Sequence, residues 1–356
     1  KRQPPRWGGL RVRVALQQDA ALTGLKLPSA NRLAVYFKLT CPAQVTVYTT
    51  HSQRGQTPAS VHAVHEVWQL DSQENIRLQD GDIATICNIR DPVGAAILAS
   101  QAFSVKAGTH YRKLTWTEVR SVLRQAFTEW HTLPDAVQTD NELGLAGQPT
   151  DAFPSWLTLW LVGLGIPHRF IRPGRPTDQP HIERTHRTLD DLALDEVSRA
   201  NVTSLQAALD RERAVYNAHF PSQASHCGGR PPLEAYPALR QPRRPYDPQV
   251  EWALFDMQRI YAFLATFTFE RRVTSSGQFR LGTHLYYVGR SLAHRTVLVS
   301  FDCKKVMWIV ATKMDAGSGS EIAQCAPVGL SFQALSGLEP HSGMPAFPVQ
   351  LTFPCL

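Results

Sequence analysis

The sequence predicts several domains built around a central α/β domain. The chain has 356 residues, which at roughly 150 residues per domain is too long for one compact unit. Between residues 61 and 200, three strand patterns precede an alternation of helices and short strands, which predicts a mixed sheet flanked by helices. Short helices precede this domain and short β-rich runs follow it, so we expect a flanking domain on each side. Because the chain begins at Lys1 rather than Met, we expect a fragment or a processed form.

Composition and charge favour a nucleic-acid partner. The net charge is +7, and the basic excess is segmental: residues 1–13 hold five basic groups and no acid, and residues 258–312 hold eight against two acids. Segmental positive charge favours a polyanion, nucleic acid first, although an ordinary basic protein remains an alternative. No apolar run reaches the roughly 18 residues that a membrane helix requires, so we expect no membrane span. We expect a cytoplasmic, nucleoid-associated protein in a bacterium, or a nuclear one in a eukaryote.

The cysteines do not form a metal-binding pattern. None of the six belongs to a C-x-x-C pair, and none has histidine partners at zinc-finger spacing. Scattered single cysteines are typical of buried small side chains in a reducing compartment. His226 and Cys227 are adjacent, but neighbours in a glycine-rich loop more often point apart, so we do not expect a nucleophile pair there.

Residues 1–50 predict a helix-turn-helix. A first helix runs from about Leu10 to Thr23, Gly24 breaks it, and Ser29 is a good N-cap for a second helix. Two helices joined by a turn that contains glycine are typical of this DNA-binding motif, although many helical hairpins share the pattern. Two early residues of the second helix are candidates for contacts to base edges: Asn31 and Arg32.

Residues 61–220 predict the α/β domain. The expected strands of its antiparallel meander are Val64–Leu70, Ile83–Ile89 and Ala95–Phe103. Thr115 and Glu118 form a capping box at the start of the next helix. The elements that follow are a strand at Ala136–Thr139, a helix at Pro154–Leu164, a strand at Arg169–Ile171 and helices at 180–197 and 203–220. A fourth strand that returns to the first would complete a mixed sheet.

The rest of the chain predicts a linker, a small β domain and a tail. Residues 221–255 are rich in proline and arginine and predict a linker. Residues 256–312 contain short β-rich runs separated by glycine turns, which predicts a β-barrel of about five strands. Residues 313–356 are rich in glycine, serine and proline with little charge, and we expect a loosely packed tail.

Three carboxylates are candidates for one site. Two predicted strands end in Asp71 and Asp140, and Glu183 lies in the first turns of a predicted helix. Ligands bind outside strand ends where the connections diverge, so the two aspartates would share one rim if their strands are neighbours. Three converging carboxylates repel one another, and hard cations such as Mg²⁺ or Mn²⁺ offset that repulsion. Each residue also has an ordinary explanation, as a turn residue or, for Glu183, a partner of Arg187.

Three segments that contain these acids resemble the catalytic core of the DDE integrase and transposase superfamily. They are Trp68–Asp71, Gln138–Glu142 and Pro180–Leu189. The third resembles the family most closely, because the last acid of such cores lies in a helix and is followed by a basic or polar stretch and Thr-Leu. Residues 216–219 and 231–236 also resemble the end of these cores. The likeness covers about residues 61–237. Many family members have a shorter spacing than the 42 residues between Asp140 and Glu183.

The resemblance implies a fold and a reaction. It implies an RNase H-like core, with the upstream helix-turn-helix and a downstream SH3-like β-barrel that are common in such transposases. It implies cleavage at DNA ends and transfer of a 3′-hydroxyl into target DNA, with two Mg²⁺ or Mn²⁺ ions held by Asp71, Asp140 and Glu183. It also implies double-stranded DNA as partner and a homo-multimer on that DNA. The absence of an upstream zinc-binding module favours a transposase over a retroviral integrase.

Further basic residues are candidates for DNA backbone contacts. They are Arg172, Arg175, Arg184 and Arg187 near the third acid, Arg243 and Arg244 in the linker, and Arg271, Arg272, Lys304 and Lys305 in the β domain. Basic side chains are often only solvated, so each assignment is a hypothesis. Two other functions remain open for the chain: a catalytically silent DNA-binding relative, and a nuclease of the same fold that only hydrolyses.

Overall fold

The chain divides into two compact units. The computed structural model describes residues 9–40, 61–108, 110–139, 153–170, 198–222, 224–312 and 321–338. One unit comprises Lys1–Asp140 and Arg169–Tyr246, and the other comprises Asn141–His168 and Asp247–Leu356. The second unit therefore takes in residues 153–168, which the sequence assigns to the α/β domain.

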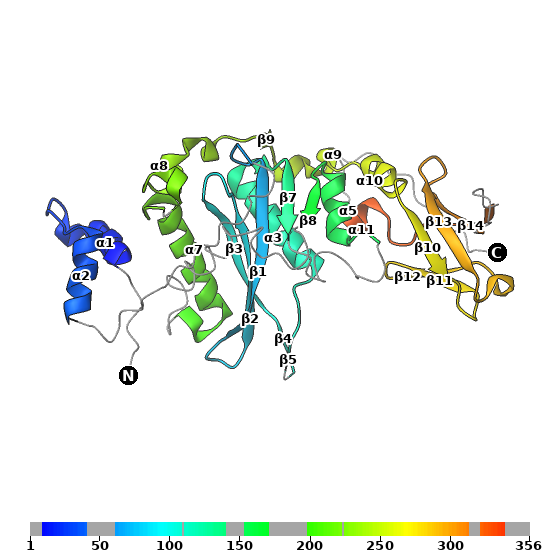
Figure 1. The fold of residues 1–356 in the computed structure, drawn as a ribbon, viewed down its shortest axis with the longest axis horizontal. Coiled ribbons are helices and arrows are strands. Elements are labelled where there is room, and N and C mark those ends of the chain that lie inside the picture. The colour runs from blue at the N-terminus through cyan, green and yellow to red at the C-terminus, as the bar shows by residue number, and fades with distance from the viewer. Residues whose placement is uncertain are drawn as a thin grey trace. The chain divides into compact units, whose positions relative to one another are not determined.

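The central sheet has the mixed topology that the sequence predicts. Three antiparallel strands form a meander: β1 (Val67–Arg77), β2 (Ile83–Arg90) and β3 (Ile97–Ser104). β7 (Ala136–Thr139) pairs with β1 in parallel, and β8 (His168–Phe170) completes the order β3-β2-β1-β7-β8 (Figure 1). The first and fourth major strands, β1 and β7, are neighbours, which is the arrangement that the sequence left open, and the mixed five-stranded sheet is consistent with an RNase H-like core.

The prediction that the first strand ends at Asp71 is wrong. β1 continues to Arg77, because its antiparallel ladder with β2 extends from Gln69 opposite Arg90 to Arg77 opposite Ile83. The residues after Asp71 are polar and half-buried, so they lack the apolar alternation by which the sequence signals a strand. The pairing with β7 covers only Val67–Gln69, so Asp71 lies just beyond the parallel part of the strand.

α3 (Trp116–Trp130) covers one face of the sheet. The predicted capping box is confirmed: the Thr115 side chain accepts from the Glu118 N–H, and the Glu118 side chain accepts from the Thr115 N–H. The helix buries a continuous apolar stripe of Val119, Val122, Leu123, Ala126 and Phe127. Phe127 packs against Trp68 of β1 at 5.4 Å between ring centroids, which fixes this face against the core.

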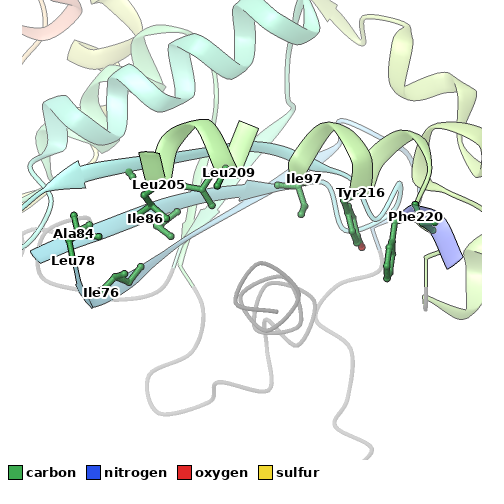
Figure 2. Close-up of a cluster of buried hydrophobic side chains, with 12 residues drawn as sticks. Ile76, Leu78, Ala84, Ile86, Ile97, Leu205, Leu209, Tyr216 and Phe220 are labelled. Carbon is green, nitrogen blue, oxygen red and sulfur yellow. The ribbon is translucent and has the colours of Figure 1, made fainter. Parts of the chain in front are cut away.

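α7 (Val202–Ala218) covers the other face. Asn201 caps it, and Leu205, Leu209 and Tyr216 recur along one side of the helix. Figure 2 shows these side chains packed against Ile86 and Ile97 from the sheet. Asn217 donates from Nδ2 to the Ile97 carbonyl and accepts from the Ile97 N–H, so a polar clamp aligns helix and strand beside the apolar cluster.

The N-terminal segment forms two helices, α1 (Gly9–Gln18) and α2 (Ala30–Thr40), as the sequence predicts. Ser29 Oγ accepts from the Arg32 N–H, which is the expected cap. A Cβ atom at Gly9 would lie 2.3 Å from the Ala30 carbonyl oxygen, so the close approach of the two helices requires glycine there. The assignment of this pair as a helix-turn-helix stays a prediction.

Much of the predicted linker packs on the first unit. Leu239 is fully buried and its carbonyl accepts from His65 Nε2 at 3.0 Å, while His65 Nδ1 accepts from Trp68 Nε1. The apolar Leu239 side chain occupies the space in front of Gly94. β9 (Arg244–Pro245) pairs with β6 (Thr132–Leu133), which extends the ordered segment to the end of the unit.

The second unit does not confirm a closed β-barrel. Its four-stranded sheet has the order β10-β13-β14-β15, and β11 and β12 form a separate pair. The bounds are β10 Thr268–Arg272, β11 Gln278–Leu281, β12 His284–Tyr287, β13 Thr296–Asp302, β14 Met307–Thr312 and β15 Glu321–Cys325. β15 and α11 (Phe332–Ser336) lie in the segment predicted to be a loose tail. That prediction is wrong for 321–338, where Cys325, Leu330 and Leu335 are buried.

The helix predicted at Pro154–Leu164 is α5 (Trp156–Gly163), buried on most sides. α5 packs against α10 (Met257–Leu264) and α11. Phe255 lies so close to Gly163 that a Cβ there would approach its ring to 2.5 Å. Burial lowers the pKa of His168 to about 4, and its Nδ1 lies 2.8 Å from Thr158 Oγ1.

The remaining elements are short. They are β4 (Lys106–Ala107), β5 (His110–Tyr111), α8 (Pro232–Ala235), α9 (Glu251–Leu254) and several single 3₁₀ turns. None of the helices in the described part of the chain has the length and apolar character of a membrane-spanning segment. The predicted helix at 180–197 lies outside the described residues.

We predict that Glu118→Gln lowers the free energy of unfolding by about 1 kcal/mol near neutral pH, because the amide loses the charge that Arg112 binds. Arg112 donates to both carboxylate oxygens at 2.8 and 2.7 Å, and these bonds, foremost, lower the pKa of Glu118 to about 2. The contribution is present above the ordinary value of 4.5 and is lost as pH falls towards about 2.

Urea denaturation of both proteins between neutral pH and pH about 2.5 measures this effect. The difference between wild type and variant is expected to shrink on acidification, and a difference that is constant with pH would contradict the account. Glu234→Gln, a change at an exposed residue of α8, is the matched control and is expected to alter stability little.

Candidate active site

Asp71 lies in β1 at the point where the pairing with β7 ends. Its side chain is half-buried, and Oδ1 accepts the backbone N–H of Ser72 at 2.8 Å. Directly across the antiparallel ladder lies Asn88 of β2. The carboxylate therefore stands on a well-formed sheet, opposite a neutral amide.

The second predicted acid follows β7. In the parallel register, Val67 is opposite Ala136, Trp68 opposite Val137 and Gln69 opposite Gln138, so β7 runs in the same direction as the strand that carries Asp71. Thr139 is buried and is the last residue of β7. Asp140 lies outside the described residues, but it is bonded directly to Thr139.

The third predicted acid and its neighbours lie outside the described residues. This holds for Glu183 and for the four arginines proposed to contact phosphates: Arg172, Arg175, Arg184 and Arg187. Among the residues that the structure does describe, no three His, Cys, Asp or Glu side chains form a metal-binding cluster. The geometry of the site is therefore anchored by Asp71 and by the end of β7.

Asp71 fits a hard cation as one ligand of a larger set. Its donors are carboxylate oxygens, which Mg²⁺ and Mn²⁺ prefer, and it is reachable from solvent because it is only half-buried. Cys87, the neighbour of Asn88 in β2, offers no competing soft ligand. Burial raises the pKa of the Cys87 thiol, and the charge of Asp71 adds to the effect, so the thiol stays protonated.

Comparison with known proteins finds a family model that matches part of the chain. Residues 164–232 match the family model described as the integrase core domain. That segment includes Glu183 and all of α7, the helix that packs on the sheet of Asp71. Over this stretch the chain is similar to integrase core domains.

Several solved structures resemble the chain weakly. The BIV integrase catalytic core is 18% identical, covers 48% of this chain and 93% of its own, and has a TM-score of 0.34. The HTLV-2 integrase core, solved with magnesium in a trimeric form, is 16% identical over 51% and 99%, with a TM-score of 0.35. The simian T-cell lymphotropic virus intasome is 15% identical over 90% and 99%, with a TM-score of 0.40.

The predicted DNA-contacting residues of the first unit differ in their surroundings. Asn31 and Arg32 are exposed on α2, as contacts to base edges require. Arg243 forms an ion pair with Asp135 at 2.5 Å, which raises the pKa of Arg243, and Arg244 Nη1 donates to the Pro134 carbonyl at 3.1 Å. Both linker arginines thus tie the chain around β9 to the loop before β7.

The basic residues of the second unit are more open. Arg272 is exposed, and Lys304 and Lys305 are exposed in the turn between β13 and β14. The backbone N–H groups of both lysines donate to Asp302, which shapes the turn and lowers the pKa of that carboxylate. Arg271 is half-buried, with its guanidinium 5.2 Å from the Phe269 ring centroid, so part of this side chain has a packing role.

The sequence analysis missed a row of buried polar residues on the face of the sheet that carries Asp71. Gln69, Asn88, Arg90 and Ser100 are each at most 5% exposed. A signal was present, because asparagine is depleted in strands and Asn88 interrupts the apolar run 83–89. The pattern of the run predicts an ordinary core strand and does not by itself indicate a role for Asn88.

We predict that Arg243→Gln lowers the free energy of unfolding by at most about 1 kcal/mol, because the ion pair with Asp135 is partly exposed to water. Thermal or urea denaturation measures the change. Arg272→Gln, an exposed arginine for which the structure shows no ion pair among the described residues, is the control and is expected to have no effect on stability. Equal effects of the two changes would contradict the role assigned to Arg243.

Proposed function

We propose that the chain is a DDE-type transposase or integrase that cleaves DNA at element ends and transfers a 3′-hydroxyl into target DNA. The observation that carries the proposal is the parallel pairing of β1 with β7. It brings the strand that precedes Asp140 beside the strand that contains Asp71. The integrase core match over residues 164–232 supports the proposal, and Glu183, the third acid of the proposed set, lies within that range.

In this proposal Asp71, Asp140 and Glu183 hold two divalent cations, Mg²⁺ or Mn²⁺. When bound, such a pair supplies activation of the attacking oxygen and stabilisation of the leaving oxygen in an in-line displacement. The protein's own part is to fix the carboxylates on a rigid sheet and to orient the phosphodiester. No side chain then needs to act as a nucleophile, which suits a site built from carboxylates alone.

The partner in this proposal is double-stranded DNA, bound by a homo-multimer. Basic side chains would hold the DNA backbone without reading its sequence, and the exposed Arg272, Lys304 and Lys305 are open to that contact. Exposed Asn31 and Arg32 of α2 would meet base edges if the helical pair binds in the major groove. Arg172, Arg175, Arg184 and Arg187 remain candidates for phosphate contacts beside the third acid.

We predict that Asp71→Asn, Asp140→Asn and Glu183→Gln each abolish strand transfer while DNA binding persists. Each change removes the charge of one proposed metal ligand but keeps the shape of the side chain. The measurement is a joining assay with labelled element ends and target DNA in Mg²⁺ or Mn²⁺, paired with a binding assay. Strand transfer that survives any one of these changes would remove that residue from the active site.

The reaction products distinguish the proposed function from the two alternative functions. Joined strands are expected for a transposase or integrase, whereas nicks without joining would indicate a nuclease of the same fold. Wild-type protein that binds DNA but gives neither product under any divalent-metal condition would indicate a catalytically silent relative.

We further predict that affinity for DNA falls steeply with salt, because each neutralised phosphate releases a counterion. Arg272→Gln is expected to reduce the slope of log K against log salt by about one if that side chain contacts a phosphate. Arg213→Gln is the control, since Arg213 is paired with Glu129 and lies against β3. A slope that is flat for the wild type would contradict the proposed partner.

A further inference from the structure

A row of side chains crosses three strands of the central sheet beside the proposed active site. Asp71 of β1 is directly opposite Asn88 of β2, and Asn88 is directly opposite Ser100 of β3. Residues directly opposite each other in an antiparallel sheet project to the same face, with Cβ atoms roughly 5 Å apart. The three side chains therefore follow one another across the sheet, and Asn88 lies in the middle.

Hydrogen bonds fix the far end of this row. Ser100 Oγ donates to Asn88 Oδ1 at 2.8 Å. α7 holds the backbone that follows this serine: Gln206 Nε2 donates to the Ser100 carbonyl at 3.0 Å, and Gln206 Oε1 accepts the Ala102 N–H at 2.8 Å. The amide oxygen of Asn88 thus faces β3, because Ser100, which donates to it, is itself held in place.

The amide nitrogen of Asn88 has no such partner among the described residues. Asn88 is fully buried, and its Nδ2 has no hydrogen-bond partner among the described residues. A buried N–H without a partner destabilises a fold, so a native structure rarely keeps one without a reason. With Oδ1 turned towards Ser100, Nδ2 is turned away from β3, on the side of the strand that carries Asp71.

The opposite orientation of the amide is unfavourable. It would turn Oδ1 away from Ser100 and towards the Asp71 carboxylate, and two oxygen acceptors would then face each other in a buried site. The hydroxyl of Ser100 is therefore sufficient to select the rotamer that presents a donor to β1. Hydrogen bonds at a catalytic site are often long before the site is loaded and shorten when it is, so the present gap is compatible with such a role.

We propose that Asn88, oriented by Ser100, is a positioning residue for Asp71. Its Nδ2–H donates to the carboxylate when the site is loaded and holds one oxygen, so that the other faces the cation. This inference rests on the proposed function, because it gives Asp71 the role of metal ligand. Outer partners of this kind set the orientation of a ligand, and their loss typically weakens metal binding or activity by about 10–100-fold.

The test uses the full chain and Mn²⁺ as the probe, with binding measured by calorimetry or electron paramagnetic resonance. Asn88→Leu removes the donor at nearly constant volume, so the fold is expected to persist and its melting temperature to hold or rise. The expected result is about tenfold weaker Mn²⁺ binding, with a matching rise in the Mg²⁺ concentration that half-saturates strand transfer. Thr85→Val, an equally buried change in the same strand on its other face, is expected to leave both unchanged.

Ser100 provides a second, independent variant. Ser100→Ala is expected to weaken Mn²⁺ binding a few-fold in the wild-type background and to have no further effect in the Asn88→Leu background, because it acts through the amide. Additive effects would indicate two separate structural roles and overturn the proposal. So would wild-type Mn²⁺ affinity in Asn88→Leu.

The outcomes also separate this inference from the proposed function. If Asp71→Asn abolishes both Mn²⁺ binding and strand transfer while Asn88→Leu changes neither, the role proposed for Asn88 is contradicted and the proposed function stands. If the wild-type chain binds no Mn²⁺, or Asp71→Asn retains strand transfer, the proposed function fails and the inference fails with it.

Discussion

The account depends on one pairing in the sheet, the parallel alignment of β7 with β1. It spans only Val67–Gln69 opposite Ala136–Gln138, yet it decides which residues can meet. Because β7 runs in the same direction as β1, its end lies near the point of β1 where their pairing stops, two residues before Asp71. An antiparallel neighbour would send the residue after Thr139 to the opposite edge, away from Asp71.

The sheet combines a rigid core with a polar strip, and both lie on the same face. Towards one end of that face, Ile86 and Ile97 pack beneath Leu205 and Leu209 of α7. Asn88 lies in β2, two residues beyond Ile86. Asn88 and its neighbours have hydrogen-bonding groups in place of this apolar packing. Polar groups in place of apolar packing destabilise a core whose only role is stability. Here they lie beside the carboxylate of Asp71, the proposed metal ligand.

Much of the fold could be predicted from the sequence, for identifiable reasons. The capping box of Thr115 and Glu118 and the strand Ala136–Thr139 carry strong local signals, and both were predicted where the structure has them. β1 was predicted too short because its second half is polar and is specified by pairing with β2, which is not a local property. For the same reason β15 was missed: it becomes a strand by pairing with β14.

The candidate site was predictable only in part. Asp71 was selected from its position after an apolar run and from family resemblance, and the structure places it in β1, two residues beyond the last residue that pairs with β7. Asn88 was not selected, because its importance arises from a hydrogen bond to Ser100 and from an amide nitrogen without a described partner. Neither feature is visible before the three strands are aligned in register.

The most direct measurement of the central claim is anomalous diffraction from crystals of the chain soaked in Mn²⁺, alone and with DNA ends. The account predicts anomalous peaks within coordination distance of the carboxylates of Asp71, Asp140 and Glu183. Peaks absent from that position in a DNA complex that is competent for strand transfer would contradict it.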